Sequence, residues 1–130
     1  MPNRPVLPRP TDAELEILQV LWQQGPSTVR RVHEVLNEGK PVGYTTVLKL
    51  MQIMTAKGLL VRDESQRSHV YRTRVPAEKT QRQLIGDLLE RAFAGSAQKL
   101  VMQALTTQKV SSQELAQIRT LLEDIARRES

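Results

Sequence analysis

Three side chains able to contact a nucleic acid lie close together in the stretch VGYTTVLKLMQIM, residues 42–54. The apolar residues of this stretch recur at helical spacing, so the other side of one predicted helix carries Thr45, Lys49 and Gln52, and we expect Thr45, Thr46 and Lys49 to make the contacts. Hydroxyl and ammonium groups donate hydrogen bonds to base edges and to phosphates, and a threonine methyl or Leu48 can contact a thymine methyl. The stretch therefore favours a binding helix over a catalytic one.

Further polar side chains precede and follow this helix. Tyr44 stands at its start, where we expect it near phosphate, and Arg67 stands at the tip of a polar turn. The preceding helix begins with Thr28, Arg30 and Arg31. Where the second of two successive helices contacts the bases, the first crosses the nucleic-acid backbone. Arg30 and Arg31 could equally form an ordinary charged surface pair. The predicted DNA-binding residues are Thr28, Arg30, Arg31, Tyr44, Thr45, Thr46, Lys49 and Arg67.

Enzymatic and metal chemistry find little support in the residues. The chain has no cysteine, no Gly-rich phosphate loop and no recognisable Ser, His and Asp grouping. His33 and His69 are its two histidines, and two histidines alone cannot complete a typical four-ligand zinc site. We expect both to be structural or exposed, and we expect no catalytic residue, no metal site and no cofactor.

Three short helices account for the first half of the chain. Thr11 and Glu14 have the spacing of a capping box at the first helix, and Gly25 ends that helix. Ser27 is expected to cap the second helix. Gly58 ends the third helix. The second helix has an apolar face made of Val29, Val32, Val35 and Leu36, and the third has one made of Val47, Leu50, Met51 and Met54.

The hydrophobic period then changes from helical to extended. LLVRD and HVYRTRV are separated by the polar ESQRS, and Pro76 follows the second run. This pattern predicts a two-stranded hairpin with Arg67 at its tip. Three helices followed by a hairpin are typical of the winged helix-turn-helix, in which the third helix enters the major groove and the wing lies along phosphates.

Three more helices with apolar stripes and little net charge follow, and Ser111 and Glu114 have the spacing of a capping box at the start of the last one. Because such stripes would leave apolar patches exposed on a monomer, a dimerisation region is the economical interpretation. Its expected contact residues are Leu88, Leu100, Leu115, Ile118, Leu122 and Ile125. The predicted fold is mainly α with a small β-hairpin wing: a flexible basic arm (1–10), a winged-helix DNA-binding domain (11–76) and a helical dimerisation region (77–130).

The distribution of charge along the chain indicates which part of it binds an anionic partner. The formal net charge is +5, and residues 1–76 carry 11 Lys and Arg against 7 Asp and Glu, whereas residues 77–130 carry 8 against 7. The basic excess thus lies in the predicted DNA-binding part. No apolar run is long enough to cross a membrane, so we expect a soluble cytoplasmic protein with no membrane insertion. The alternative is a helical protein-interaction adaptor whose basic half binds an acidic protein partner.

Four stretches carry a resemblance to a known family: TDAELEILQVLW, STVRRVHEVLNEG, GYTTVLKLMQIMTAKGLL and RSHVYRTRVP. Together with the three-helix tail they resemble the penicillinase-repressor family, the BlaI, MecI and CopY group, over residues 10 to about 126. The resemblance implies a homodimeric winged-helix transcriptional repressor that binds a palindromic operator. Its targets would be antibiotic-resistance or stress-response genes, and a membrane-bound sensor protease would relieve repression by cutting the C-terminal region.

Two departures from the family pattern bear on how repression would be relieved. Copper-responsive members have a cysteine cluster near the C-terminus, and this chain has no cysteine. Some members are cut at an Asn–Phe bond, and aligning KLVMQAL with the corresponding stretch places Gln103 and Ala104 there. The resemblance thus gives Gln103–Ala104 as the candidate cleavage bond.

Overall fold

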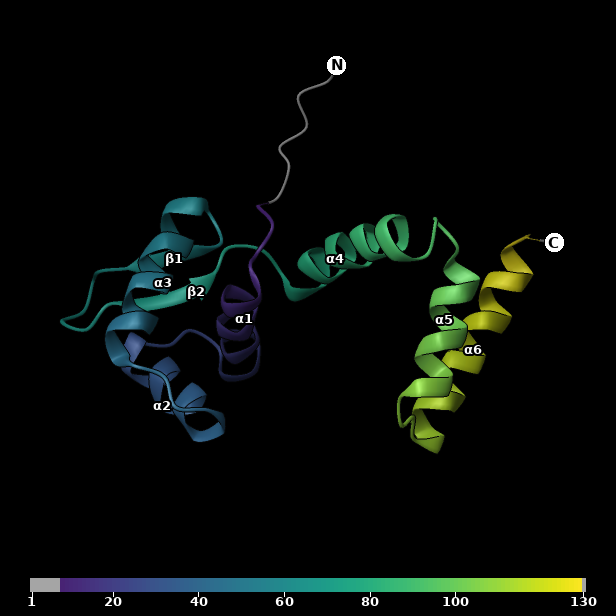
Figure 1. The fold of residues 1–130 in the computed structure, drawn as a ribbon, viewed down its shortest axis with the longest axis horizontal. Coiled ribbons are helices and arrows are strands. Elements are labelled where there is room, and N and C mark those ends of the chain that lie inside the picture. The colour runs from purple at the N-terminus through teal and green to yellow at the C-terminus, as the bar shows by residue number, and fades with distance from the viewer. Residues whose placement is uncertain (1–7, 130) are drawn as a thin grey trace, which may run out of the picture. The chain divides into compact units, whose positions relative to one another are not determined.

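The computed structural model describes residues 8–129, which form two compact units that divide between Ile85 and Gly86. The first unit holds α1 (Asp12–Gln24), α2 (Val29–Gly39), α3 (Tyr44–Lys57), β1 (Leu60–Asp63) and β2 (Val70–Thr73) (Figure 1). The division falls within α4 (Ala77–Ala92), and the second unit continues with α5 (Ala97–Thr107) and α6 (Ser112–Glu129). The predicted mainly α fold with one hairpin is confirmed. Most of the predicted basic arm, residues 1–7, lies outside the described residues.

The predicted stops of α1 and α3 and the capping box of α1 are confirmed. The Glu14 N–H donates to Thr11 Oγ1 at 3.2 Å, and the Thr11 N–H donates to Glu14 Oε1 at 2.9 Å. Gly25 and Gly58 follow the last residues of α1 and α3 with φ of 81° and 86°. This left-handed region costs glycine little and costs side-chain-bearing residues more, so each helix ends there.

The predicted cap of α2 is wrong by one residue. Thr28, not Ser27, accepts the Arg31 N–H at 3.2 Å, while the Ser27 hydroxyl donates to the Gly25 carbonyl at 2.8 Å. The backbone of Ser27 pairs with Tyr71 through bonds of 2.9 and 2.8 Å. The Ser27 hydroxyl is thus turned back to Gly25, and the extended Thr28, with φ of -79° and ψ of 163°, is the residue that caps the helix.

The core of the first unit is formed by α1, α2, α3 and the hairpin. Its fully buried members include Ile17, Val32, Val47, Met51 and Met54, each with 0% of its surface exposed. Each such side chain contributes about 1.5–3 kcal/mol of transfer free energy. The predicted faces of α2 and α3 are therefore largely the buried ones, although Val35, Leu36 and Leu50 pack only at the core's edge.

A buried carboxylate joins the start of α1 to the end of α3. Glu14 is 2% exposed, and its Oε1 accepts a bond from Lys57 Nζ at 2.7 Å. Burial raises the pKa of Glu14, but the bonds from Lys57 and Thr11 lower it by more, so the pKa lies below its ordinary value of 4.5. The ion pair supports the first unit while Glu14 is ionised.

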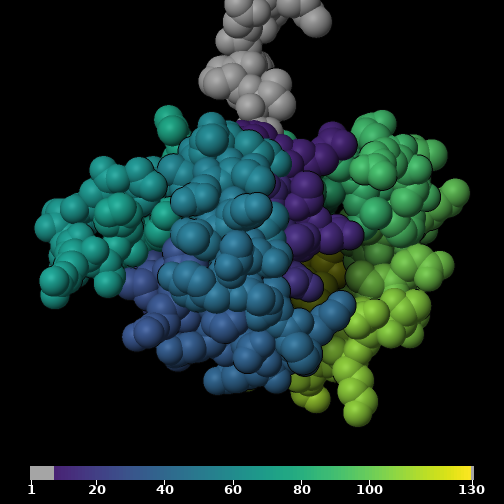
Figure 2. Space-filling model, turned by 60° about the vertical axis from the view of Figure 1, so that its left-hand side comes forward, coloured from purple at the N-terminus to yellow at the C-terminus, as the bar shows by residue number. Residues whose placement is uncertain are grey.

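The hairpin is antiparallel and extends beyond the core. Leu60 pairs with Thr73 and Asp63 with Val70, which leaves residues 64–69 as the connecting tip. The alternation of the strands turns Leu60 and Tyr71 inward, where both are buried. Figure 2 shows this wing, in teal, projecting to one side of α3.

The second unit has a different character. Helices α5 and α6 contain no buried residue, and α6 reverses direction after the short loop of residues 108–111 (Figure 1). The predicted capping box at Ser111 and Glu114 is confirmed by bonds of 3.0 and 3.3 Å. The predicted boundary after Pro76 falls at the start of α4, whereas the two compact units divide inside that helix.

Candidate nucleic-acid interface

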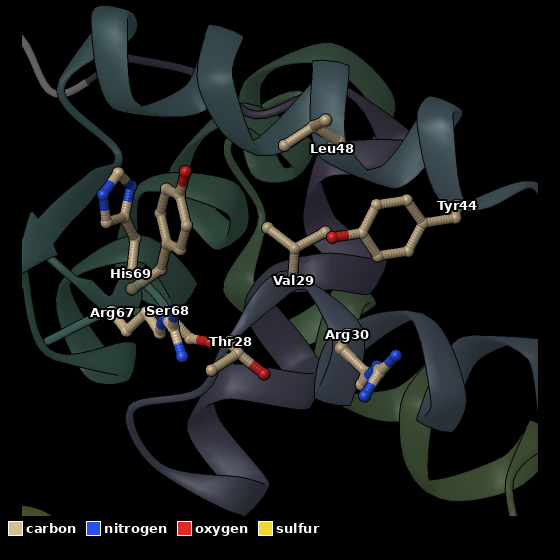
Figure 3. A pocket seen from close by; sticks show the side chains of 9 residues that line it. Thr28, Val29, Arg30, Tyr44, Leu48, Arg67, Ser68 and His69 are labelled. Atoms are coloured by element: carbon tan, nitrogen blue, oxygen red, sulfur yellow. The ribbon is translucent and has the colours of Figure 1, made fainter. Parts of the chain in front are cut away.

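A depression of about 470 Å³ lies where the wing meets the first turns of α2 and α3 (Figure 3). Four predicted DNA-binding residues from three separate segments line it: Thr28 and Arg30 from the start of α2, Tyr44 from the start of α3, and Arg67 from the wing tip. Positions 28 and 67 are far apart in the sequence. The fold thus assembles the predicted contacts into one concave surface.

The chemistry of this depression suits a polyanion. Arg30 and Arg67 supply two guanidinium groups, Thr28, Tyr44 and Ser68 supply hydroxyls, and no carboxylate is among the lining residues. The first turn of α2 adds the positive end of its helix dipole. Guanidinium and hydroxyl donors on a surface without carboxylates match the acceptor oxygens of phosphates.

The floor of the depression is apolar. Val29 and Tyr71 are 6% and 2% exposed, and the half-buried Leu48 lies beside them. Packing beneath the polar rim fixes the backbone from which the donor side chains project. An apolar floor also offers a contact surface for deoxyribose or for a thymine methyl.

Ser68, His69 and Tyr71 also line this surface and were not among the residues predicted to bind DNA. The signal for Ser68 was its position next to Arg67 in the predicted tip, whereas His69 begins the predicted strand that follows the tip. Nothing in the sequence indicated that Tyr71 would reach this surface, because the alternation of side chains along the strand predicts only that Tyr71 is buried. Its ring reaches the depression because the bridge to Ser27 brings β2 against the start of α2.

The outer face of α3 carries the other predicted contacts. Thr45 and Lys49 are exposed on it, four residues apart and therefore one turn apart, and the exposed Gln52 continues the same face. Thr46 lies toward another side of the helix, where it lines a smaller depression of about 180 Å³ with Glu16 and Lys40. Lys49 and Thr45 thus share a face that Thr46 does not.

Arg31 does not line the depression that holds Arg30. Its Nη2 donates to Gln24 Oε1 at 3.1 Å, and its Nη1 lies 3.6 Å from Glu34 Oε2. Successive helix residues differ by about 100° around the axis, so the two arginines face different neighbours. These contacts fit the alternative of a charged surface group for Arg31. The place of Arg30 in the depression fits a phosphate contact instead.

The histidines and acidic residues form no cation site in the part of the chain that is described. His33 is half-buried and bonded to the Val42 carbonyl, and His69 is exposed in the wing. Within residues 8–129 no three or more His, Cys, Asp or Glu residues group as metal ligands. No helix among these residues is long and apolar enough to cross a membrane.

Comparison with solved structures gives the fold of the first unit. The solution structure of the DNA binding domain of the repressor BlaI matches with a TM-score of 0.50 and 24% identity, covering 55% of this chain and 88% of that one. The likeness shows a winged-helix fold, with α3 in the place of the third helix and the β1–β2 hairpin as the wing.

Sequence comparisons extend the likeness toward the C-terminus. A stretch of 66 residues is 36% identical to the transcriptional regulator BlaI of Mycobacterium tuberculosis H37Rv, covering 50% of this chain and 48% of that protein. The match thus spans about half the length of this relative. A penicillinase repressor of Bacillus licheniformis is 22% identical over 118 residues, which cover 91% of this chain and 92% of that protein. Because residues 10–124 also match the family described as penicillinase repressor, the chain belongs to the penicillinase repressor family.

Proposed function

We propose that this protein is a homodimeric DNA-binding transcriptional repressor that binds a palindromic operator. The observation that carries the proposal is the depression that Thr28, Arg30, Tyr44 and Arg67 line together. In winged helices the third helix enters the major groove while the helix before it crosses the backbone and the wing lies along phosphates. The depression, beside the start of α3, would then face backbone phosphates.

Within this arrangement the residues divide into two roles. Thr45 and Lys49, exposed on α3, would face base edges, with Lys49 donating to a guanine edge. Arg30 and Arg67 would contact phosphates, which fix the register without reading sequence. Gln52, one turn beyond Lys49 on the same face, joins the base-reading set, whereas Thr46 and Arg31 become peripheral.

The second unit supports the dimer part of the proposal. Leu88, Leu115, Leu122 and Ile125 are between 43% and 56% exposed, and Leu121 and Met102 expose a similar fraction. Leu100 and Ile118, also predicted to contribute, are half-buried. Apolar side chains exposed at this density are stabilised by a second copy, and a two-fold symmetric dimer matches the symmetry of a palindrome.

The family resemblance and the exposure of α5 support a proteolytic relief of repression. Gln103 and Ala104 are both exposed, and the proposal places a sensor protease's cut at their bond. Cutting there would separate α6 from the DNA-binding unit and remove the avidity of the dimer. The repressed genes would be antibiotic-resistance genes, and derepression by an antibiotic without any shortened chain in mass spectra would refute the proteolytic route.

Duplex fragments from the protein's own promoter region test the DNA-binding proposal. Anisotropy titrations at several salt concentrations should give tight binding to a fragment with an inverted repeat, weaker binding to a scrambled one, and affinity that falls steeply with salt because counterions are released. Equal affinity for the inverted-repeat fragment and the scrambled fragment would refute an operator-binding role. Loss of DNA binding when an acidic protein is added at the same concentration of negative charge would refute it as well.

A further inference from the structure

The connection between α2 and α3 is held by two side chains of α2. The Val42 N–H donates to Asn37 Oδ1 at 3.1 Å, and His33 Nε2 lies 2.8 Å from the Val42 carbonyl. Because a carbonyl only accepts, His33 Nε2 carries a proton and donates. His33 and Asn37 are one helical turn apart, so they reach the same residue from one face of α2 and satisfy both of its backbone groups.

This support matters because α3 has no side-chain cap. Gly43 is its N-cap residue and has no side chain to accept a first-turn N–H. Capping side chains typically hold helix starts, whereas here the residue before Gly43 is fixed from the preceding helix. The bonds to Val42 thus set where α3 begins and at what angle it leaves α2.

The same histidine contacts the aromatic ring at the rim of the depression. The ring centroids of His33 and Tyr44 lie 5.7 Å apart with the planes at 81°, an edge-to-face pair. Tyr44 is 47% exposed, so few other contacts restrain its ring. Figure 3 shows the ring reaching from the start of α3 with its hydroxyl end directed into the depression.

We propose that His33 is a positioning residue for DNA recognition, which orients Tyr44 for its phosphate contact by its ring and fixes the start of α3 by its N–H. The proposal rests on the proposed function. It assigns His33 no contact with DNA, since His33 is not among the residues that line the depression. Its effect on affinity passes through Tyr44 and the entry of α3.

Two substitutions separate the two contributions. His33→Gln places an amide N–H near the position of Nε2 and so retains the bond to Val42, but it removes the ring. His33→Phe keeps a ring against Tyr44 but removes the donor. We expect His33→Phe to lower the melting temperature while keeping most of the coupling to Tyr44, and His33→Gln to keep the melting temperature while losing that coupling.

The experiment is a double-mutant cycle with the full-length protein on a duplex selected from a random-sequence library by the wild type. His33→Gln should weaken binding about three- to tenfold in the wild-type background, the size of an edge-to-face pair. In the Tyr44→Leu background, which has no ring to orient, the same substitution should change affinity less than twofold. Thermal unfolding of every variant separates affinity from stability.

Each outcome is decisive. If no duplex is enriched by the wild type, the proposed function fails and this inference fails with it. If the wild type binds and His33→Gln binds equally well, the inference alone is overturned. Equal losses in the wild-type and Tyr44→Leu backgrounds would also overturn it, because His33 would then act independently of Tyr44.

Discussion

The two units differ in where their apolar side chains lie. In the first, Ile17, Val32, Val47, Met51 and Met54 are fully buried, and a strand residue, Tyr71, closes the core. In the second, α5 and α6 contain no fully buried residue, and Leu121, Leu122 and Met102 are more than half exposed. The first unit has a core of its own, whereas the helices of the second have amphipathic faces without one. The candidate binding surface therefore lies within the first unit alone, and the proposed dimer would cover the exposed apolar side chains of the second.

The largest expected effect comes from removing the second unit. A chain that ends at Ile85 keeps the buried core and Thr80, so it should unfold cooperatively and sediment as a monomer. Loss of the link between two half-site contacts should weaken binding to an inverted repeat by about 10² to 10⁴-fold. Sedimentation and anisotropy measure both effects. A truncated chain that stays dimeric would remove the contrast between the units.

Lys49→Ala tests whether Lys49, a residue of the first unit, contributes to sequence recognition. A base-edge contact is worth ~1–3 kcal/mol of discrimination, so binding to the inverted repeat should weaken more than binding to random duplex. Lys109→Ala removes the same charge from an exposed position of the second unit and serves as the control. Equal losses on both duplexes would assign Lys49 to phosphate.

Glu14→Gln should lower the stability of the first unit alone. It replaces the charge-assisted bond to Lys57 and should cost about 2 kcal/mol at neutral pH. Because the pKa of Glu14 is lowered in the folded state, its contribution is present above the ordinary value of 4.5 and is lost as pH falls through the lower folded value. The two proteins should therefore converge in denaturation midpoint only once the pH has fallen below the lowered pKa of Glu14 in the folded protein.

Glu16→Gln is the matched control, since Glu16 is an exposed residue of the same helix with the same charge. It should change the midpoint little at any pH. A difference between Glu14→Gln and wild type that stays constant down to the acid-unfolding pH would show that the Glu14 carboxylate does not supply the stability.

Arg67→Ala should give the smallest effect, a similar loss of affinity for every duplex. Loss of one phosphate contact should weaken binding a few-fold on every duplex and reduce the magnitude of the salt slope by about one. Titrations at several salt concentrations determine the slope, with Lys109→Ala again as the control. An unchanged slope would remove the wing tip from the DNA-binding surface and leave Arg30 as the depression's contact.

Local signals in the sequence determined the element order. Two helix starts were predicted from Thr11 with Glu14 and from Ser111 with Glu114, and two helix ends from Gly25 and Gly58. Such predictions succeed because caps and left-handed backbone depend on residues only a few positions apart. The change of period after Gly58 likewise predicted the hairpin. The face of α3 that carries Thr45 and Lys49 followed from helical geometry alone.

Only the tertiary structure decided which of these residues meet. Ser27 is a residue type that caps helices, but its hydroxyl bonds to the Gly25 carbonyl and its backbone pairs with Tyr71, and Thr28 caps α2 instead. Arg30 and Arg31 looked equivalent, yet the packing of α2 leaves Arg30 in the depression and Arg31 with Gln24 and Glu34. Helix and strand signals act over a few residues, whereas these outcomes depend on contacts between segments distant in the chain, which exist only once the core has formed.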